Sequence, residues 1–323
     1  MPRKTITELQ ASQWDTEFML TDEKEIEKLV LYETDPEKHV ARIIFNNPEQ
    51  DNCLPLAAIE RIAILTQEAE YDNDVKVIIY KGNGPCFGAG ANAAELGHYI
   101  GYKAGRTKEE RIRPTQRQRM LADKNLGFGG TTRGVAQTLK VTISQVHRFC
   151  YGEHIEIALA SDIVIASDDA LFGHPAFRYL GPSPQDMYLW IENMGLKKMK
   201  ELMFSMRAMS AEEAHQCGFV TKVVPREDLE KWVEDYAQAI ALMPLDAIMI
   251  GKAMIGSITQ ARGAGLGTMT GWIGHGWSTN LSLAPDEWNF VKERRDKGLP
   301  WTLKERDQMV APYFRLGSTR SSE

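Results

Sequence analysis

A glycine-rich segment that directly follows an apolar run is the feature that most constrains the fold of this chain. The run is Val75–Tyr80 (VKVIIY), and the segment is Lys81–Asn92 (KGNGPCFGAGAN). An apolar run of this length that ends at glycine is typical of a buried parallel strand. The small residues at 88–91 let backbone N–H groups approach a ligand closely, and a helix start at Asn92–Leu96 would add its positive dipole end. The sequence therefore predicts a strand whose carboxyl end leads into a ligand-binding turn.

The order of strand, turn and helix repeats along the chain. The expected strands are Val40–Phe45, Val75–Tyr80, Thr142–Phe149, Asp162–Ala166 and Phe219–Val224. The expected helices are Leu56–Glu70, Glu153–Ala160, Gln185–Asn193, Lys197–Met203, Ala211–Cys217, Glu227–Leu242 and Pro244–Ala261, with two more near 285–297 and 302–310. Gly152 lies where the second turn of this kind should fall. Alternating strands and helices predict an α/β fold with a parallel sheet.

Three other segments carry weaker signals. Residues 1–38 are polar and are expected to form a helix and a loop before the core. Gly127–Gly130 indicates a mobile loop, and it lacks the lysine and serine of a phosphate-binding P-loop. No strand precedes the glycine-rich run at 263–276, so we expect close helix packing or a hinge there, not a dinucleotide site.

Composition excludes several classes of protein. With 323 residues, 43% hydrophobic and 25% charged, the chain is expected to be globular and soluble. The net charge of −6 argues against nucleic acid as a partner. The four cysteines, at 53, 86, 150 and 217, lie far apart, so neither a zinc site nor a disulfide framework is indicated. No window approaches the ~18 apolar residues of a membrane helix, and the N-terminus lacks an apolar leader. We expect a cytoplasmic protein with reduced thiols.

Residues 97–140 are basic in this acidic chain. They hold ten Lys or Arg against three Asp or Glu, a local balance of +7. One interpretation is a solvated helix and loop. The other is an electropositive rim that attracts a phosphorylated ligand or docks on an acidic surface of a neighbouring subunit.

Four blocks in a fixed order resemble the crotonase (enoyl-CoA hydratase/isomerase) superfamily over about residues 40–260. The blocks are NNP at 46–48, KGNGPCFGAGAN at 81–92, EIALASDIVIASDDALFGHPAF at 156–177 and MGLKKMKELMFSMRAMSAEEAHQCGFVTKVVP at 194–225. The resemblance implies a spiral of ββα units over 39–260, after an extension at 1–38 and before a helical C-terminal trimerisation region at 261–323. It also implies a homotrimer or dimer of trimers and a thioester substrate, usually of coenzyme A, whose enolate is held by two backbone N–H groups. Coenzyme A would enter as part of the substrate, so no separate cofactor and no metal is expected.

The resemblance places the two N–H donors at Ala91, after Gly90, and near Glu153, after Gly152. Ala89, Gly90, Gly152 and Ala176 are the corresponding substrate-binding positions. The family usually has a run of glycines where this chain has Tyr151–His154, which puts the geometry of the second donor in question.

The acid and base residues follow the family only in part. Hydratases of the family use two glutamates; the first falls on Glu156, and the second falls on Ala176, which cannot transfer a proton. The hypothesis that this chain hydrates its substrate with two glutamates is therefore weakened. His174 lies near the lost acid and is a candidate to reach the same pocket.

Two further side chains are candidates for acid or base work, each with a structural alternative. His154, two residues before Glu156, titrates near neutral pH, and a histidine there is the base in the family branch that hydrolyses carbon–carbon bonds of cyclic β-diketones. The alternative is a buried structural histidine. Asp186 lies where some dehalogenase and isomerase relatives keep a catalytic carboxylate, or it caps a helix. Asp162 is expected to be buried and structural.

Three functions remain open at this point. The leading one is an acyl-CoA hydratase or isomerase in which Glu156, aided by His154 or Asp186, moves the proton. The basic insertion and Trp272, Trp277, Trp288 and Trp301 favour a bulky or cyclic acyl group. The alternatives are a carbon–carbon bond hydrolase of a cyclic β-diketone that needs no coenzyme A, and a non-catalytic binding or assembly module of the same fold.

Overall fold

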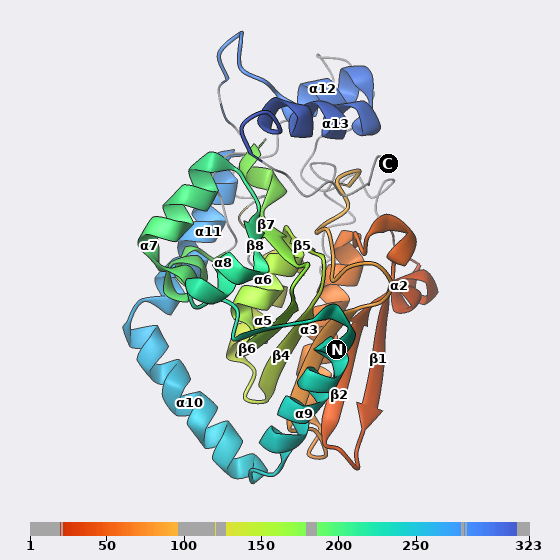
Figure 1. Cartoon of the computed structure of the whole chain (residues 1–323), viewed down its shortest axis with the longest axis vertical. Helices are drawn as coiled ribbons and strands as arrows, with labels where there is room; N and C mark the ends of the chain where they lie inside the picture. Colours follow the sequence, from red (N-terminus) through yellow and green to blue (C-terminus); the bar gives the residue numbers. More distant parts are fainter. Residues whose placement is uncertain are drawn as a thin grey trace, which may run out of the picture.

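A mostly parallel sheet lies at the centre of the computed structural model, which describes residues 20, 22–95, 120, 127–178, 186–278, 281 and 283–314 (Figure 1). Its strands, in spatial order, are β1 (Val30–Asp35), β2 (Val40–Phe45), β3 (Val77–Gly82), β4 (Val141–Val146), β6 (Ile163–Ser167) and β9 (Lys222–Val224). β1 pairs antiparallel with β2, and every later pair is parallel. The predicted α/β class is confirmed.

A second, smaller sheet gives the fold its repeating unit. It contains β5 (Phe149–Tyr151), β7 (Leu171–Gly173) and β8 (Met209–Ser210). The chain passes from β4 through β5 into helix α6 (Glu153–Ala160), and from β6 through β7 into helix α7 (Met187–Ser205). Each unit is thus a long strand, a short strand and a helix, which is the predicted ββα spiral. A bridge between Gly88 and Cys150 continues the smaller sheet into the segment after β3.

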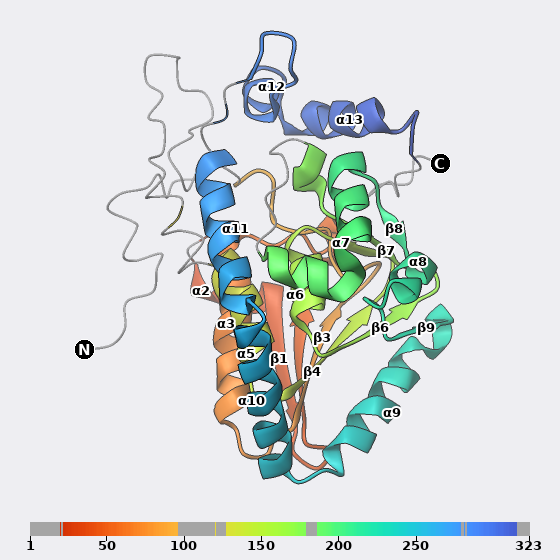
Figure 2. The same cartoon turned by 90° about the vertical axis from the view of Figure 1, so that its left-hand side faces the viewer.

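Both faces of the large sheet are covered, which explains the apolar β3 sequence. Val77 and Ile79 pack toward α9 (Leu229–Ala241), whereas Ile78 and Tyr80 belong to the cluster that includes α3 (Leu56–Tyr71). Figure 2 shows α3 and α5 (Gly127–Gln137) on one side of the sheet and α9 on the other. The sequence of a strand that is buried on both faces is a nearly continuous apolar run, without alternating polar residues.

Three local expectations were wrong. Helix α2 (Glu23–Leu29) leads into β1, a strand where only a helix and a loop were expected, because this edge strand is mostly polar and buries only Val30 fully. The predicted strand over 142–149 is two strands, β4 and β5, which separate where Arg148 adopts a positive φ of 50°. The predicted loop at Gly127–Gly130 is the first turn of α5.

The C-terminal part is helical, as expected. α8 (Ala211–Gln216) and α9 are followed by α10 (Leu245–Ala261), α11 (Ala264–Ser278), α12 (Phe290–Lys297) and α13 (Leu299–Val310). In the described part of the chain, short 3-10 helices lie at Pro48–Gln50 (η2), Pro175–Arg178 (η4) and Arg226–Asp228 (η5). The glycine-rich run lies within α11 except for Gly263, which precedes the helix, and a Cβ on Gly267 would come within 2.2 Å of the Tyr188 Cβ. Close helix packing is therefore the reason for glycine at this position.

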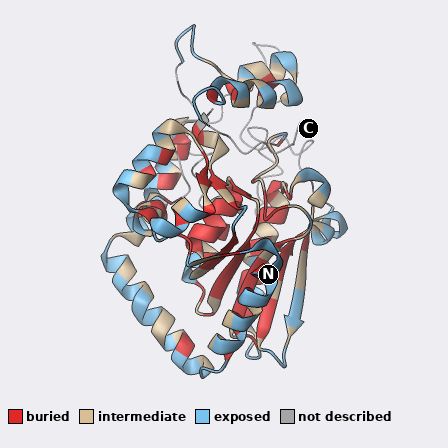
Figure 3. Ribbon diagram, in the orientation of Figure 1, coloured by how far each residue is buried: buried red, intermediate tan, exposed pale blue. Residues whose placement is uncertain are grey.

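Helix α10 extends away from the body of the molecule (Figure 1) and is exposed along most of its length (Figure 3). Within the described ranges, no single helix is long and apolar enough to cross a membrane. The segments Arg226–Ala241 and Leu245–Ala261 have the length and apolar composition of a membrane span only when taken together, and they are bent by 101° relative to each other.

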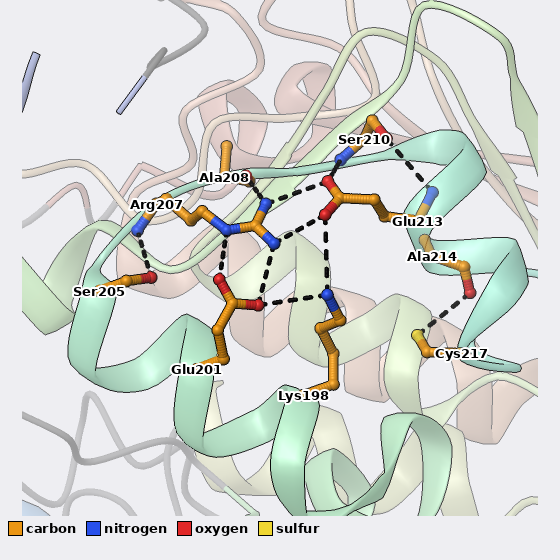
Figure 4. Close-up of polar contacts among 9 residues, drawn as sticks. All are labelled: Lys198, Glu201, Ser205, Arg207, Ala208, Ser210, Glu213, Ala214 and Cys217. Carbon is orange, nitrogen blue, oxygen red and sulfur yellow. Dashed lines mark hydrogen bonds and ion pairs between the residues drawn. The ribbon is translucent and has the colours of Figure 1, made fainter. Parts of the chain in front are cut away.

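A charged network fastens the end of α7 to α8 (Figure 4). The Arg207 guanidinium donates to both carboxylate oxygens of Glu213, at 2.7 and 3.0 Å, and also to Glu201. Lys198 approaches the same two carboxylates at 3.2 and 3.6 Å. Glu213 also closes a capping box with Ser210 at the start of α8. The hydrogen bonds from Arg207 lower the pKa of Glu213 to about 2.

Candidate active site

The two glycine turns singled out in the sequence meet in the structure. Gly90 and Gly152 have φ values of 100° and 58°, which L residues with side chains rarely adopt. A Cβ on Gly152 would lie 3.2 Å from the Gly90 Cα and 3.9 Å from the Ala91 nitrogen. A Cβ on Gly90 would lie 3.5 Å from the Glu153 nitrogen. The backbone nitrogens of Ala91 and Glu153, predicted as the two donors, therefore lie at one place where neither turn has room for a side chain.

Hydrogen bonds on either side of Ala91 orient its own N–H group. Leu54 N–H donates to the Gly90 carbonyl at 3.1 Å, and Asn92 N–H donates to the Leu54 carbonyl at 2.8 Å. Successive N–H groups of an extended chain point to opposite sides. The Ala91 N–H consequently points away from Leu54.

The second donor lies at the positive end of a helix. Glu153 is the first residue of α6, and Gly152 is its N-cap. The first N–H groups of a helix have no acceptor within the helix, and the helix dipole adds partial positive charge there. Two N–H groups at a dipole end are suited to stabilising an oxygen atom that becomes negative.

Glu156 lies one helical turn further along α6, with its side chain completely buried. Its Oε1 accepts a hydrogen bond from the indole Nε1 of Trp190 at 2.9 Å, and the His174 Nε2 lies 3.7 Å from the same oxygen. The structure thus brings together two of the four predicted acid and base residues, Glu156 and His174, and adds Trp190. No sequence signal distinguishes Trp190 from an ordinary core tryptophan in an apolar helix.

His174 is held as a neutral imidazole. It follows β7, is only 10% exposed, and stacks on Phe177 with ring centroids 4.8 Å apart. Burial, with a smaller contribution from His275, lowers the pKa of His174 to about 3. A neutral imidazole offers one donor and one acceptor nitrogen. Ala176, where the second acid was missing, lies on η4 two residues beyond it.

The predicted base His154 has a different position from the one we expected. Its ring is completely buried and makes edge contacts with Phe45 and Phe87, at centroid distances of 4.7 and 5.7 Å. Burial lowers the pKa of His154 to about 3, and its Nδ1 accepts a hydrogen bond from Gly90 N–H at 3.1 Å. His154 therefore supports the Gly90 turn, in agreement with the structural alternative, and this geometry does not fit a proton acceptor for substrate.

Asp186 also has the structural role given as its alternative, which is to cap a helix. Its Oδ1 accepts hydrogen bonds from Tyr188 N–H and Leu189 N–H as the N-cap of α7, and its Oδ2 accepts one from the Thr268 hydroxyl at 2.6 Å. With three donors on one carboxylate, Asp186 joins α7 to α11. The structure does not bring its carboxylate into contact with Glu156 or His174.

Several smaller expectations have clear outcomes. Asp162 accepts hydrogen bonds from the Thr142 backbone, as expected, but its side chain is 31% exposed and pairs with Lys252 of α10, so the expected burial was wrong. Ala89 N–H donates to the Asp51 carbonyl and fixes the glycine-rich turn. Most of the basic segment, residues 97–119 and 121–126, lies outside the described residues. Trp277 and Trp301 of the C-terminal helices are 67% and 37% exposed.

Comparison with known proteins agrees with the fold described above. The enoyl-CoA hydratase/isomerase family model matches residues 35–267. The chain is 27% identical over 248 residues to "Putative enoyl-CoA hydratase EchA13" of Mycobacterium tuberculosis, covering 72% of this chain and 75% of the relative. It is 27% identical over 209 residues to the (7aS)-7a-methyl-1,5-dioxo-2,3,5,6,7,7a-hexahydro-1H-indene-carboxyl-CoA hydrolase of Rhodococcus jostii, covering 64% of this chain and 73% of that protein.

A solved structure supports the same assignment. The crystal structure of an enoyl-CoA hydratase from Mycobacterium smegmatis superposes with a TM-score of 0.74 at 25% identity, covering 88% of this chain and 96% of that one. The family match, the shared spiral and the paired glycine turns lead to one conclusion: this chain belongs to the enoyl-CoA hydratase/isomerase family, the crotonase superfamily.

Proposed function

We propose that this chain is an enzyme that acts on an acyl-CoA thioester through an enolate. The observation that carries the proposal is the meeting of the Gly90 and Gly152 turns within one helical turn of Glu156. The Ala91 and Glu153 N–H groups would bind the thioester carbonyl oxygen. Loss of one such donor costs an enzyme roughly 3 to 4 kcal/mol of transition-state stabilisation. Because both donors belong to the backbone, they do not depend on the glycines that this chain lacks around Glu153.

Glu156 is the proposed proton carrier. Its carboxylate would remove a proton from the carbon next to the carbonyl, and the electron pair would move onto the carbonyl oxygen between the two N–H groups. Return of that proton to a different carbon of an unsaturated acyl group gives an isomer. In hydration the carboxylate would instead take a proton from water while the water oxygen bonds to the β-carbon of the enoyl group and the double-bond electrons move to form the enolate. The enolate would then take up that proton at the carbon next to the carbonyl, which gives the hydrated product. Either cycle restores the carboxylate and uses no cofactor besides the coenzyme A carried by the substrate.

His174 is the proposed second group, in place of the acid missing at Ala176. Its Nε2 lies 3.7 Å from Glu156 Oε1, close enough for the two side chains to act on one water molecule or one substrate proton. Because the imidazole is neutral at pH 7, it offers one donor and one acceptor nitrogen that would hold and orient that water molecule beside the carboxylate. This pair supports a mechanism of one carboxylate and one imidazole.

The test is a panel of CoA esters that spans short saturated, straight enoyl and bulky or cyclic acyl groups. We expect turnover of a bulky or cyclic ester, since a relative is named as a hydrolase of a cyclic CoA ester. Glu156→Gln should lower kcat by about 10²-fold or more. Glu230→Gln, on the far face of the sheet in an exposed ion pair with Lys81, is the matched control. Unchanged turnover in Glu156→Gln would remove this residue from the mechanism, and preference for short saturated esters would contradict the acyl group proposed.

Hydrolysis of a carbon–carbon bond is the second candidate, and the Glu156 and His174 pair is the observation that favours it. The pair would activate a water molecule for attack on a ketone carbonyl. The bond between that carbonyl and the adjacent carbon would break, and the electron pair would leave as an enolate that takes up a proton. Turnover of a free cyclic β-diketone, with no binding of acetyl-CoA by calorimetry, would select this reaction. Binding without turnover of either class would indicate the non-catalytic module.

The proposed assembly is a homotrimer or a dimer of trimers. Large apolar side chains are exposed on α10 and α11, among them Met254, Ile255, Ile258, Leu266 and Trp277. Contact with other copies would bury them. Light scattering after gel filtration should give a trimer or hexamer mass, and Ile258→Glu should lower it, while Gln260→Glu adds the same charge on the same helix without changing the mass. A monomeric wild-type chain would contradict the proposal.

A cytoplasmic location is proposed as well. All four cysteines are free of disulfides, as is usual for proteins of reducing compartments. Subcellular fractionation of the native protein tests this location.

A further inference from the structure

The hydrogen bond between Trp190 and Glu156 joins two side chains with almost no solvent contact. Trp190 is 1% exposed and Glu156 is 0% exposed, and the bond between Nε1 and Oε1 is 2.9 Å long. An indole nitrogen can only donate, so it requires an acceptor oxygen on the carboxyl group. Burial without donors drives a carboxyl group toward its neutral acid form, whereas a hydrogen bond to the charged form favours the carboxylate.

The indole is rigidly placed. Its ring contacts Phe177 and His174 at centroid distances of 5.5 and 6.1 Å, and His174 stacks on Phe177 in turn. The Glu156 Oε1 thus lies between the Trp190 N–H and the edge of the His174 ring. A carboxylate held on one oxygen by a rigid donor has little freedom to rotate.

Contacts outside the site, at the start of helix α7, also fix the position of the Trp190 indole. Trp190 lies one turn after Asp186, whose carboxylate caps the helix and accepts from Thr268 of α11. Gly267 packs against the same turn so closely that a Cβ would lie 2.4 Å from the Asp186 Oδ1. The start of α7, and with it the indole, cannot shift without disturbing α11.

We propose that Trp190 is a positioning residue for Glu156: its indole N–H fixes Oε1 and keeps the group as a carboxylate, ready to accept a proton. The inference rests on the proposed function in one respect, that Glu156 moves the proton. It assigns a role to a tryptophan that has no acid or base chemistry of its own, and it explains how a completely buried glutamate can act as a base at neutral pH.

Other ionisable groups near α6 remain unchanged in the variants below and therefore contribute equally to each profile. On the described elements packed against α6 and its partners, they are Glu153 and His154 of α6 itself, His174 after β7, Cys150 and Tyr151 of β5, Arg133 of α5, Asp186 and Tyr188 at the start of α7, Glu192, Lys197, Lys198, Lys200 and Glu201 further along α7, and His275 of α11.

The test compares Trp190→Phe, which keeps an aromatic ring and removes the donor, with Trp232→Phe, a control on α9 across the sheet. One hydrogen bond to a charged group corresponds to about 1 to 2 pH units. We therefore expect the acid limb of kcat/KM in Trp190→Phe to move upward by about that amount. We expect kcat at pH 7 to fall about tenfold or more, with KM within about twofold, and activity to recover partly at higher pH. Trp232→Phe should leave the profile unchanged.

Infrared spectroscopy provides a readout that does not depend on turnover. A protonated carboxyl band should appear at neutral pH in Trp190→Phe, be absent from the wild type, and disappear again in the double variant Trp190→Phe/Glu156→Gln. If Trp190→Phe folds poorly, benzothienylalanine at position 190 removes the N–H with almost the same shape. Lower stability with an unmoved pH profile and no carboxyl band would overturn the inference. The band with unchanged turnover in Glu156→Gln would instead contradict the proposed function and leave the role of Trp190 in ionisation supported.

Discussion

Replacing Gly88 with alanine tests whether His154 is packed as tightly as its role under the Gly90 turn requires. A Cβ on Gly88 would lie 2.2 Å from both Cδ2 and Nε2 of the His154 ring. Contacts between carbon atoms are favourable at about 3.5 to 4 Å, so the ring would have to retreat by more than about 1 Å. Phe45 and Phe87, both completely buried, block that movement on two sides.

The expected cost of Gly88→Ala has two parts. Overpacking of a close-packed core costs about 1 to 3 kcal/mol. Displacement of the ring also weakens the hydrogen bond from Gly90 N–H to Nδ1, worth about 0.5 to 1.5 kcal/mol. Together they predict a loss of about 1.5 to 4.5 kcal/mol in the free energy of unfolding, and lower kcat/KM because the Gly90 turn moves with the ring.

A double-mutant cycle, with the free energy of unfolding measured in urea, tests the predicted clash directly. His154→Ala alone should cost about 3 to 5 kcal/mol, as for other large aromatic side chains. In Gly88→Ala/His154→Ala the new methyl group enters the vacated space, so the double variant should be about as stable as His154→Ala. Gly134→Ala is the control, because its Cβ would meet only the Ala63 Cβ, at an ordinary 3.9 Å. Additive costs within about 0.5 kcal/mol would refute the clash.

Three further predictions concern stability. Because the pKa of Glu213 is depressed to about 2, its pairing with Arg207 stabilises the fold above about pH 4.5, and this contribution is lost as the pH falls through 2. Glu213→Gln should therefore be less stable by at most about 1 kcal/mol at pH 7 and should approach the wild type near pH 2; an equal difference at both pH values would contradict this. Thr268→Val removes one donor to the buried Asp186 and should cost about 1 to 3 kcal/mol in urea unfolding, whereas a neutral result would show that the contact is dispensable. Gly256→Ala, in α10 with nothing within 4 Å of the new Cβ, should raise the melting temperature by an amount equivalent to about 0.4 to 1 kcal/mol, and a decrease would mean that another chain fills this space.

The sequence predicted the strands that are buried on both faces and most of the helices, because those signals are local. The first four residues of β3, Val77–Tyr80, are completely buried, and their run of apolar side chains is visible in the sequence. Glu153–Ala160 begins after a glycine with positive φ and ends as expected. β1 was missed because an edge strand with one fully buried residue looks like a polar loop. Its place in the sheet depends on pairing with β2, which no local pattern contains.

The acid and base residues were harder to predict, for a reason that Glu156 and His154 show together. Both lie on α6, both are completely buried, and they are two residues apart, so they point to different sides of the helix. One side faces Trp190 and His174; the other faces Phe45, Phe87 and the Gly90 N–H. Spacing along the chain indicates a shared helix end but not which neighbours each side meets.

The proposed N–H donors were easier to predict than the acid and base residues because the donors are backbone atoms and the acid and base groups are side chains. The proposed oxyanion donors are backbone N–H groups, so what the sequence must preserve is turn geometry, and only glycine fits at positions 90 and 152. Such a constraint leaves a strong pattern in the sequence, so the two turns can be predicted from the sequence alone. Proton transfer depends on side chains, and a side chain at another position can supply it. Here an alanine occupies the position of the second acid while His174, two residues earlier, reaches the same carboxylate. A motif therefore identifies the turns of the proposed enolate site, whereas the proposed reaction depends on contacts that only the folded chain creates.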